Sequence, residues 1–456
     1  MGTAFVPPAW LAALALALSP QTASEAQDGE ARTKLEEALR RYFAAEVDGP
    51  ALRAALAAAR GREELLAEVL RTKSFLAPSG ALSRRGIVTA QHRFEEAPDV
   101  PEPGSPAALR PADNRALFFG PAQGAELCPL IVYVPDALTT ASYERELERE
   151  GTARGRFVFL VPDDEQDNEW SPTLDEHRRH VGPLRDLLLS APIDPDRVYL
   201  VGSGRGGHVT WAVGLLYADR WAGLFPCNGG IFPEGGYKAS GGVFLENARS
   251  LALFTVYNTS FDHGIDSCRM AGRKFREWGY RFEAVEEPQM RTMGLAEAMA
   301  KLEPVVRDAH PRALVKRFNH LDAGEHYWLR ALDREPREWD PGKPLQVRRK
   351  WPTDPQEQLE AVWDEVAREC ARIEGSIQGE RITVTAHGVG RLRVYFDPEL
   401  VDYGRKVTVT VNGKTHAPLA LERSAEALLR HVHETGDTSR LYWAFRDYGV
   451  RPAGGK

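Results

Sequence analysis

The chain has 456 residues, of which 43% are hydrophobic and 27% charged, and this is the composition of an ordinary globular protein. At about 100–200 residues per domain, the length suggests two or three domains. The net charge of −7 offers no basic surface, so we expect no nucleic-acid partner.

The N-terminus carries the features of an export signal. Residues 10–18 form an uncharged apolar run, and Ser24-Glu25-Ala26 supplies small residues at a cleavage site. We therefore predict a signal peptide over residues 1–26 and export to the periplasm or the extracellular space. The alternative is an N-terminal helix of the folded protein, because the segment before the apolar run contains no Lys or Arg. No other stretch approaches the ~18 apolar residues of a membrane span, so the mature chain should have no integral membrane segment.

Three regions of different character follow. Residues 27–78 place apolar side chains such as Leu35, Leu39 and Phe43 at helical spacing, which predicts a helical N-terminal segment. Strand-like and helix-like segments alternate over residues 85–330, a pattern typical of a mostly parallel sheet flanked by helices. Residues 345–456 contain alternating apolar and polar segments, which predicts a small β-rich C-terminal domain with a hairpin turn at Asn412-Gly413.

The cysteines and acidic residues do not indicate a metal site. Cys128, Cys227, Cys268 and Cys370 form no CxxC pair, and no cofactor is expected. In an exported chain they could form one or two disulfides, but Cys128 and Cys227 occupy apolar positions that favour buried free thiols. The acidic stretch 163–169 lacks the spacing and glycine of a known calcium loop, so a solvated loop is the preferred interpretation.

The segment 194–230 reads DPDRVYLVGSGRGGHVTWAVGLLYADRWAGLFPCNGG and carries the most specific motif of the chain. It resembles the secreted esterases and polyhydroxybutyrate-depolymerase-like enzymes of the α/β-hydrolase superfamily, whose nucleophile lies in a strand, G-x-S-x-G-G, helix arrangement. The resemblance extends over about residues 129–287. It implies an α/β-hydrolase fold for residues 85–330 and a serine-esterase type of active site.

The resemblance puts Gly204 where the catalytic serine should be. A nucleophile on a sharp strand-to-helix turn needs small residues two positions before and after it, and Gly202 and Gly206 meet that need. Gly204 has no side chain and can form no acyl-enzyme. Ser203 could serve as a substitute only if Val201 and Arg205 occupied the flanking positions, which suits the turn poorly. A phosphate-binding loop is disfavoured because GSGRGG lacks the following Lys-Ser/Thr.

The other members of a catalytic triad are only partly present. By the resemblance, Asp262 occupies the position of the acid, after the strand expected at residues 251–257. The histidine should follow the next strand, but residues 288–294 contain none. His326 is the best substitute for this base, and His320 is the second.

The expected oxyanion hole is also altered. The family places a histidine–glycine pair after the strand that corresponds to residues 129–134, whereas this chain has Pro135 and Asp136 there. Proline has no N–H to donate, and a carboxylate would repel a developing oxyanion. Three of the four catalytic components are therefore changed, in separate parts of the chain.

These observations leave three hypotheses. The first is an exported, catalytically inactive relative of serine esterases that acts by binding a small molecule, a glycan or a protein. The second is a hydrolase of carboxylic esters or peptides with a rearranged site built from Ser203, Asp262 and His326. The third is a structural role for the terminal regions, with the middle domain as a spacer, and fold analogy alone cannot choose among them.

Overall fold

The structure is a computed structural model, and it describes residues 20–76, 85–88, 94–96, 116–119, 126–135, 157–160, 174–231, 241–259, 265–288, 295–334, 350 and 352–450. The chain divides into two compact units, Met1–Phe75 and Leu76–Lys456. Each unit is described by itself below.

From residue 20 on, the first unit consists of three helices, α1 (Pro20–Phe43), α2 (Pro50–Ala59) and α3 (Glu63–Thr72). Their apolar positions recur at helical spacing and are buried, which gives the unit its own core: Leu35, Leu39, Tyr42, Leu52, Ala55, Leu66, Val69 and Leu70. Helix α3 ends where Lys73 takes a left-handed conformation with φ 52°. The predicted helical N-terminal segment is confirmed.

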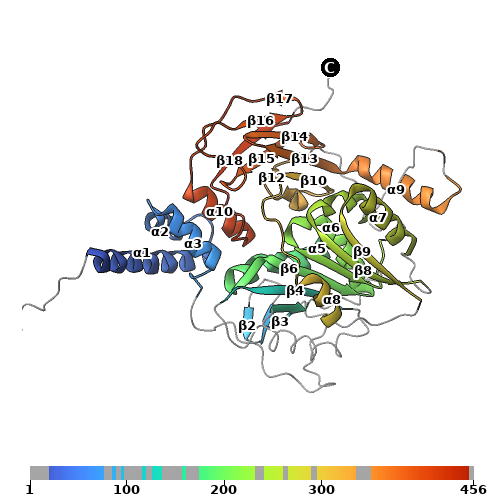
Figure 1. The fold of residues 1–456 in the computed structure, drawn as a ribbon, viewed down its shortest axis with the longest axis horizontal. Helices are drawn as coiled ribbons and strands as arrows, with labels where there is room; N and C mark the ends of the chain where they lie inside the picture. Colours follow the sequence, from blue (N-terminus) through green and yellow to red (C-terminus); the bar gives the residue numbers. More distant parts are fainter. Residues whose placement is uncertain are drawn as a thin grey trace, which may run out of the picture. The chain divides into compact units, whose positions relative to one another are not determined.

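The second unit is built on a nine-stranded sheet (Figure 1). The strands in spatial order are β2 (Phe94–Glu96), β1 (Arg85–Val88), β3 (Ala116–Phe119), β5 (Phe157–Leu160), β4 (Cys128–Val134), β6 (Ile193–Ser203), β7 (Gly223–Cys227), β8 (Ala252–Asn258) and β9 (Arg281–Glu287). Neighbours from β5 to β9 are all parallel, whereas β1, β2 and β3 pair antiparallel. The predicted mostly parallel sheet is confirmed.

Both faces of the parallel strands are covered, and this explains why they are continuous apolar runs. The helices are α5 (Leu174–Ser190), α6 (Arg205–Leu216), α7 (Ile265–Trp278) and α8 (Leu295–Leu302). Alternate residues of β4 face opposite sides: Leu130 and Val132 pack in the cluster that includes α6, and Ile131 and Tyr133 in the cluster that includes α8. Figure 1 shows α6 and α7 on one side of the sheet and α8 on the other.

Two further sheets follow the parallel one. The first has the order β10 (Ala313–Phe318), β13 (Ala371–Gln378), β14 (Arg381–His387), β16 (Thr408–Val411), β17 (Lys414–Thr415), and the second β11 (Glu325–His326), β12 (Leu329–Ala331), β15 (Arg391–Phe396), β18 (Ala444–Gly449). Helices α9 (Pro355–Glu369) and α10 (Ala425–Thr435) accompany them. Asn412 and Gly413 have φ 46° and 77° and join β16 to β17, so the predicted hairpin turn is confirmed.

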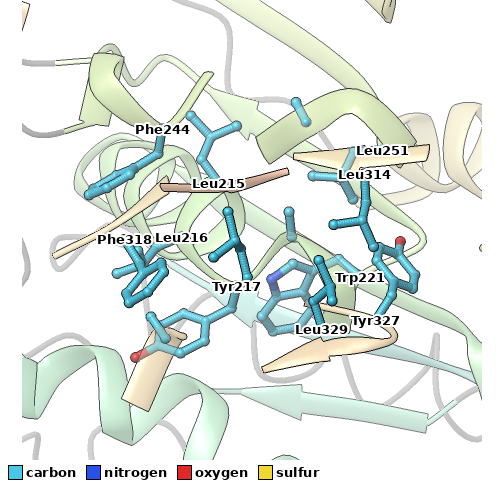
Figure 2. Close-up of a cluster of buried hydrophobic side chains, with 14 of the residues drawn as sticks. Leu215, Leu216, Tyr217, Trp221, Phe244, Leu251, Leu314, Phe318, Tyr327 and Leu329 are labelled. Atoms are coloured by element: carbon cyan, nitrogen blue, oxygen red, sulfur yellow. The ribbon is translucent and has the colours of Figure 1, made fainter. Parts of the chain in front are cut away.

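The β-rich character expected after residue 345 is present, but the strand pairing crosses the expected boundary. Strand β10 pairs with β13, and β12 pairs with β15, although β10 and β12 precede residue 345. The apolar core is continuous as well, since Leu215 and Trp221 pack in one cluster with Leu314 and Leu329 (Figure 2). Residues 313–331 are therefore shared between the α/β layer and the C-terminal strands.

All four cysteines are free thiols, and Cys227, Cys268 and Cys370 are buried. Within the described ranges, no helix has the length and apolar content needed to cross a lipid bilayer. The same residues contain no group of three or more His, Cys, Asp or Glu side chains that could hold a metal ion. The acidic stretch 163–169 lies outside the described residues.

Candidate functional site

Gly204 lies at the turn between β6 and α6, where the sequence motif predicts it. Its backbone has φ 56° and ψ −120°, in the region that favours glycine. The N–H of Gly204 donates to the carbonyl of Cys227 at 2.9 Å, which fixes the turn against the end of β7. The carbonyl of Gly204 accepts from Gly207 at 2.9 Å and begins the helix. The geometry is that of a sharp strand-to-helix elbow.

The glycines on either side of Gly204 are sterically required. A Cβ atom on Gly202 would lie 2.0 Å from the carbonyl oxygen of Gly206, and one on Gly206 would lie 1.9 Å from the carbonyl oxygen of Val134. Both contacts involve backbone, which cannot move aside as a flexible side chain can. This close packing of β4, β6 and α6 identifies Gly204 as the apex of the elbow. The residue presented there has only a hydrogen atom for a side chain.

Ser203 is the last residue of β6 and pairs in register with Cys227 of β7. It therefore continues the strand and precedes the apex. The structure brings Ser203 next to the elbow but gives it a strand position, which differs from the geometry that exposes a nucleophile at the turn.

The remaining predicted components at this edge of the sheet are described only in part. Pro135 is buried directly after β4, and its carbonyl oxygen would lie 3.0 Å from a Cβ on Gly206. A residue without an N–H thus stands beside the first turn of α6, as expected. Asp136, Asp262 and residues 289–294 lie outside the described residues.

His326 is far from the elbow. Its ring is 1% exposed, and Nδ1 lies 3.6 Å from Oδ1 of Asp219. Asp219 belongs to the 3₁₀ turn η2 (Ala218–Arg220), which follows the C-terminal end of α6. Twelve helical residues separate that end from Gly204, a length of about 18 Å. The structure therefore does not bring Ser203 and His326 together.

The second substitute is placed similarly. Nε2 of His320 lies 3.0 Å from the hydroxyl of Tyr217, also beyond the C-terminal end of α6. The sequence puts both histidines close behind β10 but does not reveal that β10 leaves the parallel sheet and pairs with β13. The histidines accordingly follow the antiparallel strands to the opposite end of α6.

One histidine does lie near the elbow, and it has a structural role. His208 is 6% exposed in α6, and its Nδ1 accepts a hydrogen bond of 2.8 Å from the N–H of Gly230. Trp211 donates to the carbonyl of Gly229 at 3.0 Å. These two side chains fasten the segment after β7 to α6, so His208 is held by packing rather than presented as a base.

At the other end of α6 the structure reveals a buried ionic cluster that the sequence motifs do not indicate. Arg440 is fully buried and donates to Asp437 at 2.7 Å and to Asp219 at 3.0 Å. Arg307 lies 2.8 Å from both Asp437 and Asp196. These five residues come from four separate parts of the chain, so no local spacing could have identified them.

Burial shifts the pKa values of Asp219, which belongs to this cluster, and of His326 and Lys316, which interact with Asp219. Burial lowers the pKa of His326 to about 4, although the neighbouring Asp219 opposes the shift. Burial also lowers the pKa of Lys316 to about 8, and its Nζ donates to the carbonyl of Leu216 at the end of α6. Burial alone would raise the pKa of Asp219, but His326, Arg220 and Arg440 together hold it well below its usual value. His326 is thus kept neutral, and the carboxylate of Asp219 is kept ionised.

No protein-family model matches the sequence, and no curated protein matches it. Solved structures give distant similarities. Esterase 2 of Thermogutta terrifontis has 14% sequence identity over 42% of this chain and 85% of its own, with a TM-score of 0.34. Acylaminoacyl peptidase of Pyrococcus horikoshii has 12% identity over 39% of this chain and 35% of its own, with a TM-score of 0.32. A thermostable esterase has 18% identity over 38% of this chain and 50% of its own, with a TM-score of 0.31.

The second unit has an α/β fold, a mostly parallel sheet flanked by helices, and additional antiparallel sheets follow the parallel one in the chain. The similarity is distant, and the matched part spans about a third to a half of the peptidase and of the thermostable esterase.

Proposed function

We propose that this chain is a catalytically inactive protein of the secreted esterase and polyhydroxybutyrate-depolymerase-like group, and that it acts by binding a small molecule, a glycan or a protein. The observation that carries the proposal is Gly204 at the apex of the elbow with φ 56° and ψ −120°. A residue without a side chain at that point can neither attack a carbonyl nor hold an acyl group. The buried Pro135 beside the first turn of α6 supports the proposal, because it withholds an oxyanion donor.

The alternative hydrolase built on Ser203, Asp262 and His326 has less support. Its base would have to act across about 18 Å, the length of α6. General-base catalysis needs contact at hydrogen-bond distance or through one water molecule.

The proposal includes export through a signal peptide over residues 1–26, which a secretion assay with that segment fused to a reporter would test.

The first expected result concerns covalent labelling and turnover. A fluorophosphonate probe should label no residue of the purified protein, and the acceleration of p-nitrophenyl ester hydrolysis over buffer should stay below about 10³–10⁴-fold. The reason is the missing nucleophile, without which an oxyanion hole and substrate binding supply only about 10³–10⁴-fold acceleration, and here Pro135 weakens the hole. Mass spectrometry of the probe-treated protein is the measurement. Labelling at Ser203, abolished in Ser203→Ala, would contradict the proposal.

A second expected result concerns Gly204→Ser. The new hydroxyl would stand at the apex, but the described residues place no unengaged histidine beside it, since His208 is bonded to Gly230. Esterase activity should therefore stay within about tenfold of the wild type. The positive φ should also lower the free energy of unfolding by about 1–3 kcal/mol, measured by urea denaturation. Gly204→Ala is the control and should show the same loss of stability. Fast ester turnover by Gly204→Ser alone would mean that a working base exists.

A further inference from the structure

Strand β9 is the end strand of the nine-stranded sheet (Figure 1). It pairs with β8 along its whole length, and within the described residues no strand pairs with its other side. Most of its side chains are exposed or half-buried, and Val285 is 41% exposed. An end strand presents a row of unpaired backbone groups, which makes it a template for one further strand.

The backbone groups that point away from β8 belong to alternate residues of β9. The carbonyl of Glu287 accepts from the N–H of Thr259 at 2.9 Å, so the backbone groups of Glu287 face β8. Neighbouring residues of a strand point their backbone groups to opposite sides. The N–H and C=O groups of Phe282, Ala284 and Glu286 therefore point to the open side, and they have no backbone partner in the described ranges.

The charges of β9 specify how a second strand would align. Arg281 begins the strand and Glu287 ends it, and both lie on the same face because side chains alternate. In an antiparallel pair of two β9 strands centred on Ala284, Arg281 of each copy lies opposite Glu287 of the other. In a parallel pair in register, each charged residue would face its own copy, and like charges directly opposite are destabilising. The pattern therefore favours the antiparallel arrangement.

Arg281 is available for this contact, because its side chain is exposed and makes no ion pair in the part of the chain that the structure describes. Two other acidic residues of the strand already have cationic partners in the same chain. Glu283 pairs with Lys301 of α8, and Glu286 pairs with Arg269 of α7 at 2.8 Å. Their charges are offset within each copy, so a second β9 strand would meet little repulsion from them.

We propose that two copies of this chain associate through β9, so that their sheets become continuous across a two-fold axis at Ala284. Ala284 would face Ala284 of the second copy, and Phe282 would face its Glu286, and each such pair can exchange two backbone hydrogen bonds. The exposed Val285 would lie diagonally opposite Val285 of the second copy. A contact of this symmetry closes on itself and gives a dimer, not a fibre. The elbow at Gly204 has no part in it.

The first test is the mass of the full chain in solution, measured by light scattering after size exclusion and by sedimentation equilibrium over a range of protein concentrations. A species of twice the mass of one chain should form as the concentration rises. Ala284→Pro should abolish this species, because proline removes the central N–H, which points away from β8 and bonds to nothing within the described fold. A monomer at every concentration up to the millimolar range would overturn the proposal.

Charge reversal tests the antiparallel alignment. Arg281→Glu and Glu287→Arg should each weaken the dimer by about tenfold or more, because each places like charges opposite each other at both symmetric positions. The double variant Arg281→Glu, Glu287→Arg brings opposite charges together again and should recover most of the wild-type affinity. The matched control is Arg405→Glu, which reverses an arginine that is 69% exposed and lies outside β9 and its flanking helices, so the dimer should be unchanged.

These variants also distinguish β9 from any other dimer surface. A dimer that forms equally well in the wild type, in Ala284→Pro and in the single charge variants would use another surface, and the proposal would be wrong. If circular dichroism shows that Ala284→Pro does not fold, the charge variants decide alone. A double variant that associates no better than the single variants would then contradict the pairing of Arg281 with Glu287.

Discussion

Replacing Arg440 with methionine should lower the free energy of unfolding by about 3–5 kcal/mol, because it removes the cation that donates hydrogen bonds to two buried carboxylates. Arg440 has no exposed surface and donates to Asp437 and Asp219 at 2.7 and 3.0 Å. After its removal Asp437 keeps Arg307 at 2.8 Å, but the nearest groups left to Asp219 are Arg220 and His326, at 3.7 and 3.6 Å. A loss of this size is a large part of the total stability of a domain, about 5–15 kcal/mol. Urea denaturation near pH 7 measures it.

Two comparisons separate this electrostatic effect from a general loss of packing. Arg405→Met removes an arginine that is 69% exposed and lies 3.5 Å from Glu380, so the stability should change little. In the double variant Arg440→Met, Asp219→Asn, the second change removes one unpaired charge and should restore part of the loss. If Arg440→Met is as stable as Arg405→Met, the cluster does not contribute to stability in the way described.

The sequence predicted the elements whose patterns are local. The sequence predicts a helix over residues 265–278, because the apolar residues follow one helical stripe, and helix α7 has these bounds. The elbow at Gly204 followed from steric need, since the glycines before and after it pack backbone against backbone. These features depend on residues that are close in the sequence.

Other elements were missed or misplaced for physical reasons. Strand β7 (Gly223–Cys227) has five residues with a glycine and a proline, too short and irregular to give a period. The sequence predicts a helix over residues 355–373. In the structure α9 ends at Glu369, and β13 begins at Ala371 because its side chains alternate against β10 and β14. The sequence also predicts a last strand over residues 441–445, whereas the strand lies at Ala444–Gly449, where it pairs with β15. The positions of all three strands, β7, β13 and the last strand, are determined by pairing with strands that are distant in the sequence.

The candidate site, too, could be predicted only where it depends on local sequence. Local sequence identified Gly204 as the apex, but the partners of His326 are set by topology, because Asp219 and Arg440 lie more than a hundred residues before and after it. The buried ionic cluster is likewise assembled from four segments that no motif connects. Such a site becomes visible only once the antiparallel sheets are seen to adjoin the end of α6.

The stability of this protein should fall between about pH 7 and pH 5, and replacing His431 with phenylalanine should reduce that fall. His431 is 3% exposed, and neither ring nitrogen has a hydrogen-bond partner within the described residues. Its ring packs against Tyr395 and Tyr442, at centroid distances of 5.0 and 4.7 Å. Burial lowers its pKa to about 4, and the charged groups that also act on it are Glu325, Arg440, Asp437 and Arg220.

The direction of this pH dependence follows from the protonation of His431 in the folded and in the unfolded chain. In the unfolded chain a histidine has a pKa near 6.5, so below that pH the unfolded state binds a proton that folded His431 does not. The stabilising contribution is therefore complete above pH 6.5 and is lost as the pH falls toward 4. For one histidine the loss between about pH 7 and pH 5 is about 2 kcal/mol, and His326 should contribute similarly.

The carboxylates of the cluster act in a different window. The pKa values of Asp219 and Asp437 lie well below 3.8, because burial, which would raise them, is outweighed by the neighbouring arginines and, at Asp219, by His326 as well. Their stabilising contribution is present above pH 3.8 and is lost only at lower pH, so the range from pH 7 to pH 5 reports on the histidines. Urea denaturation at pH 7 and pH 5 measures the difference. His431→Phe should lose about 2 kcal/mol less than the wild type, whereas the exposed His387→Phe should behave as the wild type. An equal pH dependence in all three proteins would show that His431 is not buried in its neutral form.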